Sequence, residues 1–342
     1  TLNAGAIRVP VYRTGIPQLD VALGVGGLPK GRIIEIYGTE SSGKTTLCLS
    51  LAGQIQAQGD IVGIIDVENS LDPTWAGRCG VDIDNLILSQ PNCAEDAFKV
   101  AESLIVNDCN CVIIDSVSAL VPKAEIYGEF GDSHMGLQAR LMSQALRKLT
   151  GKAKKKNAVI VFINQIREKI GVVWGSPETT SGGRALKFYS SVRVDVRRGL
   201  KQKANKNSED IIGMEPRIKI VKNKVAPPFK ICNPVLNFES GFDVHSNVFK
   251  ALIDSGEIKA KGSWYSWGDD SLGQGKSNAF DNFLEMVDDK IIDTLYNNYL
   301  VDNLNISSEM TDGKKKNTKS KKRKSKKRKS KKRKSKKGKK KR

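Results

Sequence analysis

The sequence contains no apolar run of the roughly 18 residues that a membrane-spanning helix needs, and no signal peptide opens it. It also lacks a Cys-x-x-Cys pair, the commonest sign of a zinc site or a redox dithiol. We therefore expect its six cysteines to be reduced thiols in the core of an intracellular protein. These absences predict a soluble protein with no membrane partner.

Acidic residues are entirely missing from the end of the chain. Residues 314–342 hold 22 of the 57 Lys and Arg residues and repeat Lys-Lys-Arg-Lys-Ser three times. The remainder has 35 basic and 37 acidic residues, so the net charge of +20 comes from this tail alone. A tract of Lys, Arg and Ser cannot bury enough apolar surface to fold, and we expect residues 303–342 to be disordered.

A phosphate-binding loop is the most informative motif that is present. Residues 38–45 read Gly-Thr-Glu-Ser-Ser-Gly-Lys-Thr, directly after an apolar run at 33–37 and before a helical stretch at 46–58. In this pattern backbone N–H groups surround phosphate oxygens, the lysine reaches the β/γ-phosphates and the threonine hydroxyl can bind Mg²⁺. The N-terminal dipole of the helix favours the same anion. The motif predicts a nucleoside triphosphate site.

Strands and helices alternate through the first two thirds of the chain. Continuous β-branched runs, which are typical of strands covered on both faces, occur at residues 33–37, 61–66, 86–88, 111–115 and 158–163. Helical patterns separate them, including residues 94–106 and 135–148. The pattern predicts an α/β fold with a mostly parallel central sheet.

A smaller unit follows the predicted sheet. A helix at 244–253, short strands around Ile258 and at 264–265, and helix again at 279–299 predict a small C-terminal α/β domain. We divide the chain into a core at residues 1–241, the small domain at 242–302 and the basic tail at 303–342.

Polar residues mark the carboxyl ends of three predicted strands, where ligands of parallel sheets bind. Asp115 fits an aspartate that helps to hold Mg²⁺, and Asp66 or Glu68 could orient the water that attacks the γ-phosphate. The amide pair Asn164–Gln165 could sense that phosphate. Each of these alone could be a helix cap. Together with the phosphate loop they predict a hydrolysis site.

Longer motifs surround these elements. They are GTESSGKTT at 38–46, DVENSLDP at 66–73, GDSHMGL at 131–137, FINQIR at 162–167 and GSPETTSGG at 175–183. With them the chain resembles the bacterial RecA recombinases, in order from about residue 7 to about residue 299. The resemblance implies a RecA-type P-loop ATPase core and an ATP-dependent filament on single-stranded DNA. Such a filament pairs with homologous duplex DNA and exchanges strands during recombination, DNA repair and the SOS response.

The same resemblance implies roles for individual residues, with ATP and Mg²⁺ as the cofactors. Glu68 would be the hydrolytic base, Lys44 a catalytic lysine and Gln165 the γ-phosphate sensor. Thr45 and Asp115 would hold Mg²⁺, Asp115 directly or through water. The nucleotide contacts would be Gly38, Thr39, Glu40, Ser41, Ser42, Gly43, Lys44, Thr45, Thr46, Asp72, Trp75, Asp115 and Phe238.

Two of these nucleotide contacts have particular features. The family usually has tyrosine where this chain has Trp75, but an indole stacks on a purine as well as a phenol does. Phe238 could instead be an ordinary core aromatic.

DNA contacts are implied by two loops, at about residues 125–136 and 168–183. The candidate residues are Arg140, Arg147, Arg167, Trp174, Gly182, Gly183 and Arg184. Each arginine alone could equally be a solvated charge. The small domain would gather duplex DNA, with Trp264 and Trp267 packed inside it. We expect the protein at the nucleoid in the cytoplasm, or in a nucleus or organelle if the host is eukaryotic.

Self-association into a helical filament is also implied. Lys222 and Lys224 match a lysine pair that reaches the γ-phosphate from the neighbouring subunit, and Phe188 resembles an interface aromatic. Because alternate residues of a strand share a face, both ammonium groups can point at one anion.

Two departures from the family concern the ends of the chain. The sequence starts at Thr1, close to the core, so we expect that an N-terminal assembly segment precedes it in a longer protein. Relatives commonly end in an acidic segment, whereas this chain ends in a basic repeat. We expect the tail to hold DNA without sequence preference, and a nuclear or nucleoid address, or solvation alone, is the alternative.

Other functions compete with strand exchange. A RecA-like regulatory protein that binds ATP and coats DNA without exchanging strands is one alternative, and a ring-forming helicase motor is another. Glu68, Gln165 and the second loop argue against the first, and the motifs at 131–137 and 175–183 argue against the second.

Overall fold

The computed structural model describes residues 9–129, 136–168, 171, 175, 177–203 and 208–304. Its strands are β1 (Val11–Tyr12), β2 (Leu28–Pro29), β3 (Ile33–Gly38), β4 (Val62–Asp66), β5 (Ile87–Ser89), β6 (Cys111–Asp115), β7 (Val159–Glu168), β8 (Glu178–Thr180), β9 (Val192–Lys203), β10 (Ile211–Asn223), β11 (Ile231–Cys232), β12 (Leu236–Asn237), β13 (Ile258–Lys261), β14 (Trp264–Trp267) and β15 (Asp270–Gln274).

The helices alternate with these strands. They are α1 (Pro17–Leu23), α2 (Lys44–Ala57), α3 (Pro73–Arg78), α4 (Ala94–Val106), the 3₁₀ turn η1 (Val117–Ala119), α5 (Lys123–Ile126), α6 (Leu137–Lys156), α7 (Ala185–Tyr189), α8 (Val244–Asp254), α9 (Lys276–Met286) and α10 (Asp289–Leu304).

One large sheet organises the core. Its main path runs β11-β10-β9-β3-β7-β6-β4-β5, and β8 and β12 pair with β7 and β10. From β9 to β5 every neighbouring pair on this path is parallel, whereas β10 is antiparallel to β9. Because the carboxyl ends of parallel strands share one edge, the polar residues predicted there come together. The predicted α/β fold with a mostly parallel sheet is confirmed.

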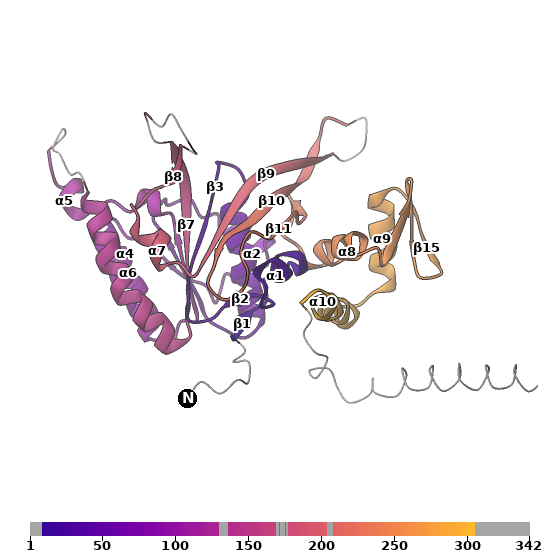
Figure 1. Ribbon diagram of the computed structural model, residues 1–342, viewed down its shortest axis with the longest axis horizontal. Helices are drawn as coiled ribbons and strands as arrows, with labels where there is room; N and C mark the ends of the chain where they lie inside the picture. Colours follow the sequence, from indigo (N-terminus) through magenta and orange to yellow (C-terminus); the bar gives the residue numbers. More distant parts are fainter. Residues whose placement is uncertain are drawn as a thin grey trace, which may run out of the picture. The chain divides into compact units, whose positions relative to one another are not determined.

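Helices cover both faces of this sheet (Figure 1). On one face α2 buries Leu47, Leu51 and Ile55 against the strands, and α1 packs in the same cluster. On the other, α4 and α6 bury Phe98 and Leu146. Each such side chain contributes about 1.5–3 kcal/mol when it leaves water. Burial on both faces explains why the predicted strands are continuous apolar runs.

Of the two helices on the second face, one has the predicted bounds and the other is longer than predicted. Helix α4 has the predicted bounds, but α6 ends at Lys156 rather than at residue 148. Leu149 and Ala153 extend the buried stripe by another turn and a half, and Asn157 then ends the helix with a left-handed φ of 54°.

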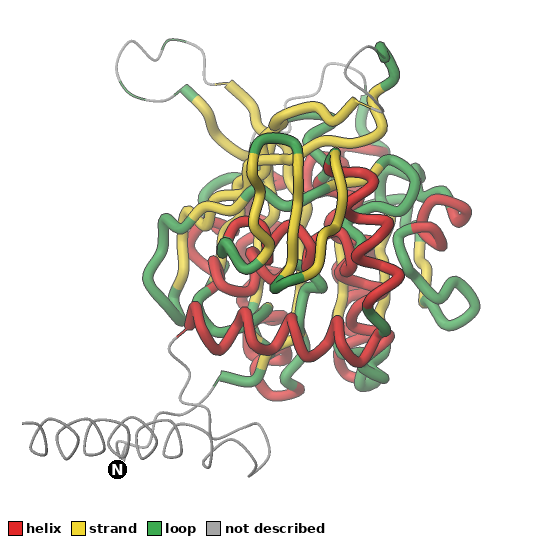
Figure 2. Tube along the Cα trace, turned by 90° about the vertical axis from the view of Figure 1, so that its right-hand side faces the viewer, coloured by secondary structure: helices red, strands yellow, loops and turns green. Residues whose placement is uncertain are grey.

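The small domain packs strands β13–β15 against α8, α9 and α10 around Phe249, Phe283 and Tyr296 (Figure 2). The prediction of helix throughout residues 279–299 is wrong, because α9 ends at Met286 and α10 begins at Asp289. Val287 is extended, and an Asp288 carboxylate oxygen accepts a hydrogen bond from the Ile291 N–H at 2.8 Å. An aspartate that caps a new helix favours this break over continuation.

The tryptophans of the small domain differ in burial. Trp267 packs on Phe283, with ring centroids 5.4 Å apart. The prediction that Trp264 packs inside the domain is wrong, since it is 55% exposed. It lies on β14, where alternate side chains face opposite sides of the small sheet.

Other predictions concern the whole chain. All six cysteines are free and buried, as predicted. Among the described residues, no helix is long and apolar enough to cross a membrane. The domain boundaries at 241 and 302 stay predictions. The predicted disorder is wrong for Asn303 and Leu304, which belong to α10, and the rest of the basic tail lies outside the described residues.

Candidate nucleotide and DNA site

The phosphate loop connects β3 to α2 in a conformation that requires glycine. Gly43 has a φ of 90°, in the left-handed region that favours glycine. A Cβ on Gly38 would lie 1.9 Å from the carbonyl oxygen of Val196 on β9, and one on Gly43 would lie 2.9 Å from Leu236. Neighbouring strands therefore hold the loop tightly at both of its glycines.

Polar atoms of this loop fit an anion. The Lys44 ammonium donates a hydrogen bond to the carbonyl oxygen of Thr39 at 2.7 Å, and burial lowers the pKa of that lysine. The buried Ser42 hydroxyl oxygen has no hydrogen-bond partner. Both groups lie at the start of α2, where free backbone N–H groups and the helix dipole favour negative charge. A triphosphate would supply an acceptor for the Ser42 hydroxyl and further acceptors for the Lys44 ammonium.

The predicted metal ligands are in contact. The Thr45 hydroxyl donates to an Asp115 carboxylate oxygen at 2.8 Å. Burial raises the pKa of Asp115 to about 6, with Glu68 and Asp66 adding to the rise while the Thr45 hydrogen bond opposes it. Hydroxyl and carboxylate oxygens are ligands that Mg²⁺ prefers, and a cation would offset the cost of the buried charge. This pair fits Mg²⁺.

The predicted base and the predicted sensor also meet. The prediction that the strand of the sensor ends at residue 163 is wrong, because β7 continues to Glu168 and contains Gln165. The Gln165 side-chain amide donates to a Glu68 carboxylate oxygen at 3.1 Å. The same oxygen accepts a hydrogen bond from the Ser116 hydroxyl, which follows Asp115. Two donors therefore fix the Glu68 carboxylate beside the phosphate loop. Electrostatic interactions of the Lys44 ammonium with Glu68 and Asp115 place all three charges in one site.

Asp66, the other carboxylate considered as a base, is committed to local structure. It is buried and accepts hydrogen bonds from the Leu71 N–H at 3.1 Å and from the Gln90 amide at 3.0 Å. A carboxylate whose lone pairs hold the following loop is poorly placed to take a proton from water. Glu68 is therefore the better candidate.

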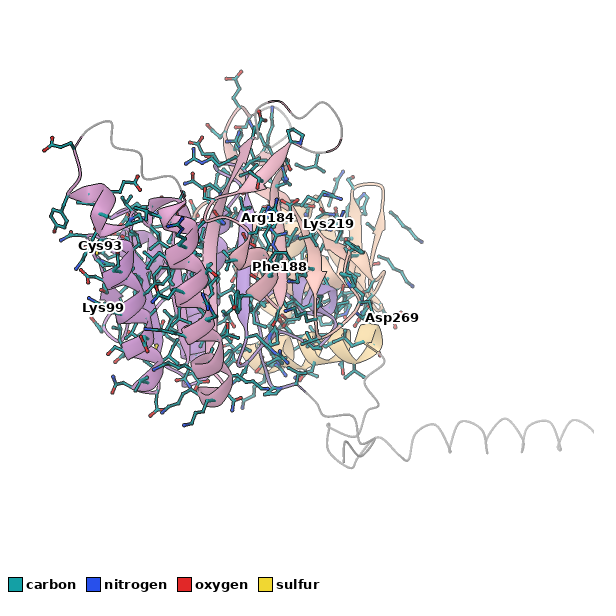
Figure 3. The ribbon with its side chains drawn as sticks, turned by 60° about the vertical axis from the view of Figure 1, so that its left-hand side comes forward. Cys93, Lys99, Arg184, Phe188, Lys219 and Asp269 are labelled. Carbon is teal, nitrogen blue, oxygen red and sulfur yellow. The ribbon has the colours of Figure 1, made fainter. Side chains whose placement is uncertain are left out.

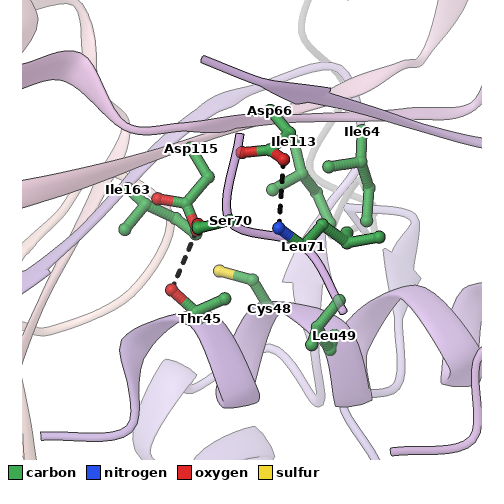
Figure 4. Close-up of a pocket in the computed structure, with 10 residues that line it drawn as sticks. All are labelled: Thr45, Cys48, Leu49, Ile64, Asp66, Ser70, Leu71, Ile113, Asp115 and Ile163. Carbon is green, nitrogen blue, oxygen red and sulfur yellow. Dashed lines mark hydrogen bonds between the residues drawn. The ribbon is translucent and has the colours of Figure 1, made fainter. Parts of the chain in front are cut away.

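A small cavity lies between α2 and the strand ends (Figure 4). Its volume is about 20 Å³, and Thr45, Cys48, Leu71 and Asp115 are among the residues that line it. This volume holds at most a water molecule and cannot hold a nucleotide.

The elements that carry the predicted adenine contacts also lie near the start of α2. A Cβ on Gly241 would contact Cys79, next to α3, at 2.9 Å and Thr46 at 3.4 Å. Asp72 caps α3 by accepting from the Thr74 N–H at 2.8 Å, and Trp75 packs partly on the core. The adenine contacts of Asp72 and Trp75 stay predictions.

Phe238 precedes Gly241 in the same turn. It is 46% exposed, so the alternative of an ordinary core aromatic is wrong. Its contact with the adenine of the nucleotide stays a prediction.

The candidate DNA contacts lie on neighbouring elements. Arg140 and Arg147 are exposed and seven residues apart on α6, which places them on one helix face. A Cβ on Gly183 would lie 2.9 Å from Ala139 of α6, and one on Gly182 would lie 2.7 Å from Val117 of η1. The glycine pair therefore anchors the end of the second loop beside the first arginine.

The remaining DNA candidates lie on other elements or outside the described residues. Arg167 is exposed on β7, and Arg184 is exposed just before α7. Trp174 lies outside the described residues, as do parts of both loops. The DNA contacts stay predictions.

Lys222 and Lys224 point at the end of α7. The Lys222 ammonium donates to the carbonyl oxygens of Lys187 at 2.5 Å and Phe188 at 3.1 Å, and the Lys224 ammonium donates to Phe188 at 3.1 Å. The Phe188 side chain is 70% exposed, and Figure 3 shows it on the same side of the molecule as Arg184. Burial and the nearby charges of Lys224 and Arg193 lower the pKa of Lys222. The lysine pair and the predicted interface aromatic thus form one cluster.

Sequence reasoning missed several residues of the site. Ser116 contacts Glu68, and the Arg198 guanidinium donates to the carbonyl oxygen of Glu40 in the phosphate loop at 2.9 Å. Outside the site itself, it also missed Glu35, a fully buried carboxylate in the middle of β3. The one available signal for Glu35 was a charge inside an otherwise apolar run.

Together, the parallel sheet, the phosphate loop, the paired Thr45 and Asp115, and the Glu68–Gln165 contact define a P-loop nucleotide-binding ATPase. The model of the RecA N-terminal domain matches residues 2–243, and that of the RecA C-terminal domain matches residues 248–298.

Curated relatives agree with these matches. "Protein RecA" of Clostridioides difficile (strain 630) is 53% identical over 284 residues, which are 83% of this chain and 80% of the relative. "Protein RecA" of Psychrobacter arcticus is 52% identical over 81% of this chain and 78% of its own length. The corresponding protein of Lactobacillus johnsonii is 52% identical over 80% of this chain and 75% of its own length. The chain belongs to the RecA family.

Family membership decides between the competing functions. The chain is an ATP-binding protein of homologous recombination and DNA repair, as predicted, and the alternative of a DNA-coating protein without strand exchange is not supported. Its activity is that of a DNA-dependent ATPase.

Proposed function

We propose that the chain hydrolyses ATP to ADP and phosphate at this site and couples hydrolysis to strand exchange. The hydrogen bond between Gln165 and Glu68, 3.1 Å long, carries the proposal. It places a neutral amide, which can bind the γ-phosphate, against the carboxylate that can activate water. Loss of the phosphate would change the partner of Gln165, and Gln165 lies at the base of the second DNA loop.

The residues of the site would divide phosphate binding, metal binding and water activation among them. The backbone N–H groups of the loop and Lys44 hold the phosphates, and Thr45 and Asp115 hold Mg²⁺. Bound Mg²⁺ supplies positive charge beside the phosphate oxygens. Glu68 orients a water molecule for in-line attack and accepts its proton, while Ser116 keeps the Glu68 carboxylate in place.

Assembly is the second part of the proposal. Lys222 and Lys224 of one subunit would reach the γ-phosphate bound by the next, and Phe188 would pack at that interface. Repulsion between the two ammonium groups lowers the pKa of Lys222, after burial itself. An anion from a neighbour would relieve both costs. ATP would thus join subunits into a helical filament on single-stranded DNA at the nucleoid, ready to pair with duplex DNA.

Strand exchange tests this function directly. Circular single-stranded DNA and homologous linear duplex are incubated with ATP and either the unmodified chain or Lys44→Ala. We expect joint molecules with the first and none with the second, because Lys44→Ala removes the cation that reaches the β/γ-phosphates. DNA-stimulated hydrolysis without exchange would instead favour a DNA-coating protein.

A further inference from the structure

A buried carboxylate lies behind the nucleotide site. Glu35 is in β3, three residues before the phosphate loop begins, and its side chain is fully buried. Sheet register places it opposite Arg193 of β9 and opposite Phe162, within β7. A buried carboxylate is costly unless each of its oxygens has a partner, so its contacts must be strong ones.

Both oxygens of Glu35 have partners on different strands. One accepts a hydrogen bond from the Asn164 side-chain amide at 3.0 Å, and the other accepts from the Arg193 guanidinium. Arg193 also lies over the Tyr37 ring, 4.6 Å from its centroid. Glu35 therefore joins β7 to β9 across the strand that leads into the phosphate loop.

Asn164 extends this contact to the sensor and to the second loop. Its amide nitrogen also donates to the carbonyl oxygen of Ser181 at 3.1 Å, and its amide oxygen accepts from the Gln165 N–H at 2.9 Å. A primary amide has two N–H donors, so Glu35 and Ser181 use both. The Asn164 side chain is thus fixed between the sensor and the residue that precedes Gly182.

Arg193 extends the contact in the other direction. It pairs with Lys222 in the register of β9 and β10, and it repels the Lys222 ammonium while Glu35 attracts it. Lys222 in turn holds the carbonyl oxygens at the end of α7. Glu35 is thereby linked through Asn164 to the sensor Gln165 and to the second loop. Through Arg193 and its own charge it also affects the proposed intersubunit lysine, Lys222.

We propose that Glu35 is a positioning residue that couples the nucleotide site to the DNA loop and to the subunit-facing lysine. The inference rests on the proposed function of Gln165, Gly182 and Lys222. Glu35 reaches none of the reacting atoms itself. Its role is to keep Asn164 and Arg193 in one arrangement, so that a change at Gln165 moves the loop end at Ser181.

Glu35→Gln tests the coupling with little change of shape. Glutamine offers one acceptor and one N–H₂ donor, so it satisfies either Arg193 or Asn164 and leaves the other facing a donor. We expect the glutamine oxygen to accept from the charged Arg193, so that the glutamine N–H₂ group faces the Asn164 amide. Asn164 must then reorient, and it loses its hydrogen bond to Ser181. We expect nucleotide affinity and DNA-free hydrolysis to be unchanged, whereas stimulation of hydrolysis by single-stranded DNA falls about tenfold or more, as for other supporting residues.

The matched control is Glu215→Gln on β10. Glu215 also pairs with cations, Lys276 at 3.0 Å and Lys250 at 4.0 Å, but these belong to α9 and α8 of the small domain. We expect the control to keep full stimulation. A residue with a merely structural role would lower the melting temperature and both hydrolysis rates together, and that result, or normal stimulation in Glu35→Gln, would overturn the proposal.

Hydrogen exchange keeps the proposal testable if Glu35→Gln fails to fold. In the unmodified chain without DNA, a non-hydrolysable ATP analogue should slow amide exchange in residues 178–186. No slowing there would refute the coupling. Absence of DNA-stimulated hydrolysis in the unmodified chain would instead contradict the proposed function, and slowed exchange would still support the coupling.

Discussion

Glu68 shows how much of the chemistry depends on a single side chain. Its carboxylate accepts hydrogen bonds from Ser116 and Gln165, and a glutamine at this position could accept the same two bonds through its amide oxygen. Glu68→Gln therefore removes the base while keeping the geometry. We expect hydrolysis to fall by about 10²–10⁴-fold, the usual contribution of a general base, with nucleotide binding retained.

Phosphate release and binding of a fluorescent ATP analogue measure these two effects separately. The matched control is Glu102→Gln on α4, where the carboxylate pairs with Lys152 at 2.8 Å away from the strand ends. The control should hydrolyse ATP at the normal rate. Hydrolysis by Glu68→Gln at the rate of the control would show that another group activates water.

Sequence reasoning located the residues of this site better than their contacts. Lys44, Asp115, Glu68 and Gln165 were predictable because a motif or a strand end marks each of them. The partners of Glu35 were not, because they depend on the register of β3 with β7 and β9, which local patterns do not encode.

Helices α1 and α10 meet at a buried acid, which gives the join between core and small domain a pH dependence. The Tyr296 hydroxyl of α10 donates to Asp20 of α1 at 2.5 Å, and the Thr14 N–H donates to the same carboxylate at 3.2 Å. Burial raises the pKa of Asp20 to about 7 despite these bonds. No local sequence pattern indicates this contact, since the two residues are 276 positions apart.

The sign of the effect follows from linkage. Because the folded state binds the Asp20 proton more tightly than the unfolded state, this stabilisation is complete below pH 4 and is lost as the pH rises to about 7. Asp20→Asn should remove that loss, which is on the order of a few kcal/mol. We expect the unfolding midpoint of the unmodified chain to fall relative to the variant between pH 4 and pH 7.

Urea unfolding at a series of pH values measures this difference. Asp302→Asn, an exposed change on the same helix α10, is the control and should follow the unmodified chain at every pH. A constant difference between Asp20→Asn and the unmodified chain across the window would contradict the shifted pKa of Asp20.

Some helix boundaries could be predicted from the sequence and others could not. Helix α4 was predictable to the residue because its apolar stripe ends where α4 ends. The break between α9 and α10 was not, because the helical pattern continues through it and one aspartate cap decides the outcome.

At the scale of the whole molecule, the charge is divided in a way that family membership does not explain. Residues 314–342 of the tail hold 22 basic residues, whereas the other 313 residues of the chain are nearly neutral. Neutralising Z phosphates gives a slope of about −0.7Z to −0.9Z in a plot of log affinity against log salt. If the tail engages about six phosphates, removing it should flatten the slope by about four to five.

Truncation after Thr311 and a full-length variant with glutamine at all 22 basic tail positions test this together. Both variants remove the positive charge of the tail, but only the truncation removes the tail residues themselves. Binding of random single-stranded DNA is measured over a range of salt concentrations without nucleotide. We expect the two variants to show the same flattened slope, because counterion release depends on charge and not on sequence. A slope unchanged in both would assign the tail to another role, such as an address, and would leave non-specific affinity to the core.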